Sequence, residues 1–120
     1  MGNLKSINKQ NQKQVQTNME FILIYITHEN IEQARKVAEH LLEKRLIACV
    51  NYFPIESSYW WKGKIENSKE IVSLCKTKAE NWERVREEVE KIHPYETPCI
   101  IKLEVESNGS YTDWINKETE

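Results

Sequence analysis

This 120-residue chain lacks the short motifs that mark many enzymes. It contains no G-x-S-x-G, no P-loop, no H-E-x-x-H and no C-x-x-C, which argues against a serine nucleophile, nucleotide hydrolysis and a standard zinc site. No apolar run approaches the ~18 residues of a membrane span, and no segment has the apolar core of a signal peptide. The three cysteines, Cys49, Cys75 and Cys99, are odd in number and widely spaced, which predicts free thiols in a reducing, cytoplasmic setting.

The chain also has no excess of basic residues in its main part. The net charge is −2, but residues 1–18 hold three lysines and no acid, so residues 19–120 carry 14 basic and 19 acidic residues. A nucleic-acid-binding domain needs a basic face, so this balance predicts no nucleic-acid partner.

Residues 1–18 are rich in Asn, Gln and Lys and hold few large apolar side chains. Such a segment buries too little apolar surface to offset its ordering entropy. We therefore expect a disordered polar extension over residues 1–18 and one folded domain over residues 19–120. Met1 to Ser6 match the N-myristoylation pattern, although a chance match in a polar tail is the alternative. We expect contact with a membrane only if Gly2 is lipidated.

The rest of the sequence alternates between strand-like and helix-like segments. Apolar periodicity, turn residues and a Gln three positions after Asn30 set the expected boundaries. We expect strands over 20–27, 47–61, 64–77 and 98–105, and helices over 30–45, 79–92 and 111–116. This order predicts an α+β, ferredoxin-like βαββαβ sandwich, with two helices on one face of a four-stranded antiparallel sheet.

Two features predict that the folded chain assembles with copies of itself. Residues 20–27 are apolar at both odd and even positions, yet two helices cover only one face of the sheet. Residues 47–61 are too many for a small sheet and would carry Tyr59, Trp60 and Trp61 beyond the body on an extended hairpin. We expect a homotrimer, the simplest closed ring, with these aromatics at the interface; a monomer with a mobile hairpin is the alternative.

Five motifs resemble the CutA divalent-cation tolerance family: Ala48-Cys49-Val50-Asn51, Ser58 to Glu66 (SYWWKGKIE), Lys76-Thr77, His93-Pro94-Tyr95-Glu96-Thr97-Pro98 and Tyr111-Thr112-Asp113-Trp114-Ile115. The resemblance covers about residues 20–116. It implies a ferredoxin-like homotrimer with an architecture similar to the PII signalling proteins. It also implies an association with tolerance of copper and other divalent metals, and no established enzymatic activity. The chain departs from the family at Ile26, where other members are proposed to use a cysteine.

A metal site is one kind of chemistry that these motifs offer. His93 ends a helix, where the dipole favours a protonated imidazole, and nearby prolines hold Glu96 in a fixed position. Together with Cys49 as a soft ligand, these residues would suit Cu²⁺ or another divalent cation, which we do not expect folding to require. A well-ordered turn at His93 and a small buried Cys49 are the alternatives.

The register of the hairpin decides what Cys49 faces. If Lys62 and Gly63 form a two-residue turn, Cys49 lies opposite Lys76. A shift of one residue places it opposite Cys75 and creates a potential two-thiolate site.

The resemblance also implies a ligand cleft between subunits, lined by Trp61, Glu66, Lys76, Tyr95 and Trp114. Lys76 ends an otherwise apolar strand, where a charge needs a partner, and Glu66 or Glu96 is a candidate. Alternatively, Lys76 and His93 hold a small anion between aromatic walls.

Three functions follow from these observations. The first is a non-enzymatic trimer that responds to metal ions and binds copper or other divalent cations weakly. The second is a PII-like signalling trimer that binds a small anionic ligand in its intersubunit clefts. The third is a trimeric scaffold that assembles other proteins.

Overall fold

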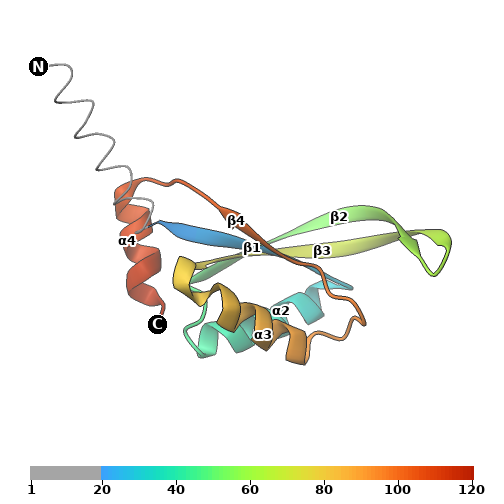
Figure 1. The fold of residues 1–120 in the computed structure, drawn as a ribbon, viewed down its shortest axis with the longest axis horizontal. Coiled ribbons are helices and arrows are strands. Elements are labelled where there is room, and N and C mark those ends of the chain that lie inside the picture. Colours follow the sequence, from blue (N-terminus) through green and yellow to red (C-terminus); the bar gives the residue numbers. More distant parts are fainter. Residues whose placement is uncertain (1–19) are drawn as a thin grey trace, which may run out of the picture.

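A computed structural model describes residues 20–120 (Figure 1). The predicted extension over residues 1–18 and the lipidation of Gly2 lie outside the described residues. No helix within residues 20–120 is long and apolar enough to cross a membrane. The elements are β1 (Phe21–His28), α2 (Ile31–Glu43), β2 (Cys49–Trp61), β3 (Lys64–Lys78), the short 3-10 helix η1 (Ala79–Asn81), α3 (Trp82–Ile92), β4 (Ile100–Glu104) and α4 (Gly109–Glu118).

The four strands form one antiparallel sheet in the order β2-β3-β1-β4. Helices α2 and α3 lie side by side on one face of the sheet (Figure 1). The predicted α+β, ferredoxin-like fold is therefore confirmed, with β1 and β3 in the centre and β2 at an edge. The predicted trimer concerns several chains and stays a prediction.

The core lies between the sheet and the two helices. Ile22, Ile24 and Ile26 alternate along β1 toward this layer and are at most 2% exposed. Leu41 of α2 and Val89 of α3 complete the core from the helix side. Each such side chain stabilises the fold by about 1.5–3 kcal/mol when it leaves water.

Helix α2 has a defined cap at each end. At the start, the Asn30 side-chain oxygen accepts a hydrogen bond from Gln33 N at 2.9 Å, as the sequence predicted. At the end, Arg45 takes a positive φ of 58°, and the amides of Arg45 and Leu46 donate to the carbonyls of Leu42 and Leu41.

Strands β2 and β3 are joined by a two-residue turn in which Lys62 and Gly63 have φ of 50° and 82°. Two successive positive φ angles are typical of a type I′ turn. This turn sets the register that pairs Cys49 with Lys76, while Cys75 pairs with Val50. Because neighbouring residues of a strand point to opposite faces, the alternative site with Cys49 facing Cys75 is excluded.

The hairpin projects well past the rest of the sheet (Figure 1). Strand β1 ends at His28, which pairs with Ile71, so residues 55–70 form a two-stranded segment that we call the arm. At its far end, Trp60 is 72% exposed and its cross-strand partner Ile65 is 61% exposed.

The sheet face opposite α2 and α3, which we call the open face, is apolar and only partly covered. Ile101 and Leu103 of β4 are 46% and 44% exposed, and Phe53 of β2 is exposed as well. Helix α4 covers one end of this face through Tyr111, whose ring packs edge-on against Phe21. On this side of β1 itself, Phe21 and Thr27 are buried while Leu23 and Tyr25 are half-buried, so the prediction that β1 is buried on both sides is met in part within one chain.

Candidate functional site

The residues predicted to form the site fall into three separate places in a single chain. Cys49, Lys76 and Trp114 lie at the α4 end of the open face. His93, Tyr95 and Glu96 lie in the loop 93–99, between α3 and β4. The arm carries Tyr59, Trp60, Trp61 and Glu66.

His93 is buried and both of its ring nitrogens have partners. Nε2 donates to the carbonyl of Thr27 at 2.8 Å, and Nδ1 accepts from the amide of Tyr95 at 3.1 Å. A nitrogen that accepts a hydrogen bond carries no proton, so the ring is the neutral Nε2–H tautomer. The expectation of a protonated imidazole at this helix end was wrong, because the next loop residues supply a donor to the ring.

A second histidine, His28, stacks on His93 and was missed in the sequence. The ring centroids are 5.1 Å apart with an interplanar angle of 22°. His28 is fully buried, and its Nε2 lies 2.7 Å from Ser73 Oγ. Burial lowers the pKa of His28 to about 4. The burial of His28 could have been predicted from the sequence, since His28 continues the even-numbered positions of β1 that face the core.

Tyr95 connects the loop to the arm. Its ring packs edge-on against His93 at a centroid distance of 4.7 Å, and its hydroxyl donates to the Glu70 carboxylate at 2.8 Å. Burial and the adjacent carboxylate raise the pKa of Tyr95, so the phenol stays a hydrogen-bond donor at physiological pH. Glu70 did not stand out in the sequence, because its partner is 25 residues away.

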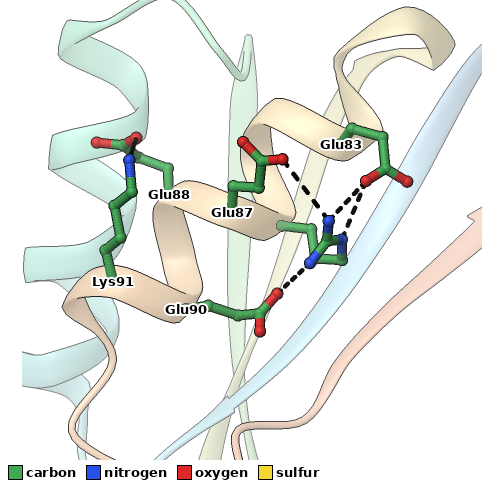
Figure 2. Close-up of polar contacts among 6 residues, drawn as sticks. Glu83, Glu87, Glu88, Glu90 and Lys91 are labelled. Atoms are coloured by element: carbon green, nitrogen blue, oxygen red, sulfur yellow. Dashed lines mark hydrogen bonds and ion pairs between the residues drawn. The ribbon is translucent and has the colours of Figure 1, made fainter.

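Glu96 lies on the other side of the loop, toward α3. It borders a cavity of about 380 Å³ together with Arg86 and Glu90. Arg86 forms ion pairs with Glu83 and Glu90, part of a cluster of charged side chains along α3 (Figure 2). The positive charge of Arg86 is already balanced by Glu83 and Glu90, so Glu96 adds a further negative charge to this cavity.

Lys76 and Cys49 face each other at the opposite end of the open face. Lys76 Nζ donates to the hydroxyl of Tyr111 at 3.0 Å and lies 5.2 Å from the centre of that ring, which stacks on Trp114. Among the described residues, Lys76 forms no ion pair with a carboxylate. The sequence had pointed to Glu66 or Glu96 as its partner, and within one chain the partner is Tyr111.

Spacing along the strands shows how far apart these places are. Lys76 and Glu66 are ten residues apart on β3, or about 33 Å at 3.3 Å per residue. Cys49 lies level with Leu23 of β1, four residues or about 13 Å from Thr27, to which His93 is bonded. Within residues 20–120 of one chain, no group of three or more His, Cys, Asp and Glu side chains can hold a metal ion. Any site that uses Cys49, His93 and Glu96 together therefore needs residues from two chains.

The chain is similar to known proteins of one family over most of its length. Residues 22–118 match the family described as CutA1 divalent ion tolerance protein. The divalent-cation tolerance protein CutA of Archaeoglobus fulgidus is 46% identical over 98 residues, which cover 81% of this chain and 96% of that protein. The protein of the same name from Thermotoga maritima is 47% identical over 97 residues, covering 80% and 96%.

Solved structures give the same result for the fold. The periplasmic divalent cation tolerance protein CutA from Archaeoglobus fulgidus has a TM-score of 0.80 and 44% identity to this chain. The match covers 83% of this chain and 99% of that one.

Proposed function

Because this chain belongs to the CutA1 divalent ion tolerance family, we propose that it is a homotrimer that contributes to tolerance of divalent cations, binds them weakly and catalyses no reaction. The relatives at 46% and 47% identity bear the name of divalent-cation tolerance proteins and are matched over nearly their whole length.

The observation that carries this proposal is the uncovered apolar surface. Ile101 and Leu103 on the open face and Trp60 on the arm are 44–72% exposed in one chain. Neighbouring exposed apolar side chains such as Ile101 and Leu103 mark an interface with another protein, and Trp60 adds a second exposed apolar group at the end of the arm. A ring of copies would cover the open face and pair the free edge of β2, and three is the smallest number that closes such a ring.

In such a ring, the metal ligands would come from two chains. Cys49 would supply the thiolate from one subunit, and the loop that carries His93 and Glu96 would come from its neighbour. Soft sulfur favours copper among the divalent metals, and His93 would join it only by giving up the hydrogen bond from Tyr95 N to its Nδ1. Binding would be weak, since the positively charged Lys76 faces Cys49.

Calorimetry with Cu²⁺ tests this site. We expect Cys49→Ser and Glu96→Gln each to weaken Cu²⁺ binding at least about tenfold, because each removes one ligand of a small set. His93→Ala is less suitable, since His93 is buried and holds the loop through Thr27.

Two variants serve as matched controls. Cys99→Ser changes another half-buried free thiol, and Glu90→Gln changes another carboxylate at the same cavity. Unchanged affinity in both Cys49→Ser and Glu96→Gln, or equal losses in the controls, would remove the proposed site.

A second function is supported by Lys76. The ammonium of Lys76 is half-buried and contacts the hydroxyl and the ring of Tyr111. Among the described residues it forms no ion pair with a carboxylate. When a second chain covers the open face, an anion is needed to balance this charge. A small anionic ligand in the intersubunit cleft would meet that need. Inorganic phosphate in the same calorimeter, with Lys76→Met as the comparison, separates this function from metal binding.

The cytoplasmic location is also part of the proposal. Its support is that Cys49, Cys75 and Cys99 are all free thiols in the fold, as expected in a reducing compartment. The relative from Archaeoglobus fulgidus is described as periplasmic, so fractionation of the native host is the direct test.

A further inference from the structure

The arm depends on few contacts with the body of the chain. Residues 55–70 extend past the end of β1, so β2 and β3 have no third strand beside them in this segment. A two-stranded hairpin is marginally stable by itself in water. Its side-chain hydrogen bonds from Ser58 to Asn67 and from Ser68 to Tyr59 stay within the arm. Within one chain, contacts at the base of the arm therefore limit its motion relative to the body.

Besides the continuous pairing of β2 with β3, a side-chain hydrogen bond ties the base of the arm to the loop 93–99. Glu70 is the first residue of β3 beyond the pairing with β1, and it accepts the hydroxyl of Tyr95 at 2.8 Å. Hydrogen bonds to a charged carboxylate are stronger than those between neutral groups. Both partners are half-buried, which reduces competition from water.

The other end of Tyr95 is fixed in the body of the chain. Its amide donates to His93 Nδ1 and its ring packs against the His93 imidazole. His93 in turn donates to the Thr27 carbonyl and stacks on the buried His28. An unbroken series of direct contacts therefore runs from the core through the loop to Glu70.

We propose that the Tyr95–Glu70 hydrogen bond is a latch: it couples the loop 93–99 to the base of the arm, so that the two segments unfold locally together. The latch does not require the proposed function. A role for the latch in ligand binding does rest on that function, because the loop carries the proposed site residues His93 and Glu96 and the arm carries Trp61 and Glu66. A ligand that displaces the loop would then change the freedom of the arm.

Hydrogen exchange on the full-length protein tests the latch. In Tyr95→Phe, amides of both residues 94–99 and residues 66–70 should exchange about tenfold faster, since one hydrogen bond to a charged group is lost. Tyr59→Phe is the matched control: it removes a phenol hydroxyl whose hydrogen bond stays within the arm, and residues 94–99 should exchange at the wild-type rate.

Substitutions of the acceptor make the test specific. Glu70→Ala should reproduce the faster exchange in both segments, and adding Tyr95→Phe to it should cause little further change. Glu70→Gln keeps an acceptor oxygen and should restore part of the protection. Faster exchange in Tyr95→Phe that is confined to residues 94–99, or that adds fully to the effect of Glu70→Ala, would overturn the latch. Light scattering on the same samples reports the assembly separately, so a failed trimer proposal is distinguished from a failed latch.

Discussion

The side chain of His28 is fully buried next to a second histidine, and this makes the fold sensitive to acid. Its pKa is about 4 in the folded chain against an ordinary value of 6.5. The unfolded chain binds this proton more readily, so stability is full above pH 6.5 and falls as the pH drops toward 4. The shift corresponds to a loss of about 3 kcal/mol, because one pKa unit is worth about 1.4 kcal/mol.

The substitution His28→Phe tests this prediction, because phenylalanine keeps a ring against His93 but does not titrate. Urea unfolding at fixed protein concentration should show a smaller stability loss between pH 7 and pH 4.5 in the variant than in the wild type. An identical loss in both proteins would show that other groups cause the acid sensitivity.

At the scale of single residues, the sequence predicted local roles better than contacts between residues that are far apart in the chain. Asn30 was correctly predicted as the cap of α2, because a cap depends on residues three positions apart. The hydrogen bond of Lys76 to Tyr111 joins residues 35 apart and depends on where α4 packs. That placement follows from the assembled fold, which local patterns do not describe.

The two-residue turn of the hairpin is the element on which the register of the arm depends. Gly63 has a φ of 82°, a conformation that an L-residue adopts only with strain, and a Cβ atom there would meet no other atom within 4 Å. Gly63→Ala should therefore destabilise the protein by about 1 kcal/mol through backbone strain alone.

Gly109 provides a matched control for this prediction. It begins α4, lies outside the positive-φ region and also has open space around its Cα. Gly109→Ala should be neutral or stabilising by up to about 1 kcal/mol, because alanine favours the helix. The free energy of unfolding of both variants decides the matter: equal effects would mean that the turn conformation is not what Gly63 supplies.

Element order was predictable because it depends on local signals. The sequence left two registers open for the hairpin, and the structure has the one that a two-residue turn at Lys62 and Gly63 gives, with Cys49 opposite Lys76. The boundaries were less accurate: the helix predicted over 79–92 begins as the 3-10 helix η1, and the strand predicted over 98–105 is reduced to Ile100–Glu104. The contacts between elements at the loop 93–99 had no local signal.

For the molecule as a whole, the two faces differ in what they present. Helix α3 carries Glu83, Glu87 and Glu90 around Arg86, a charged cluster that suits contact with water (Figure 2). The open face presents Ile101 and Leu103 instead. Because burying charged groups is costly and burying apolar ones is favourable, assembly should proceed through the open face.

A pair of substitutions with similar exposure tests which face assembles. Leu103 on the open face is 44% exposed and Ile92 on the helix layer is 38% exposed. Leu103→Glu should place a charge in the interface and convert a trimer, three times the 14.3 kDa chain mass, into monomers. Ile92→Glu should leave the trimer intact, as measured by size-exclusion chromatography with light scattering.

The effect of Leu103→Glu on assembly also bears on the predicted ligand sites, because the residues of those sites are about 13–33 Å apart along the strands of one chain. If Leu103→Glu yields folded monomers, those monomers should also lose Cu²⁺ binding, since Cys49 and the His93 loop would no longer meet between chains. A wild-type protein that is monomeric, or a monomeric Leu103→Glu variant that binds Cu²⁺ with wild-type affinity, would contradict a site shared between subunits.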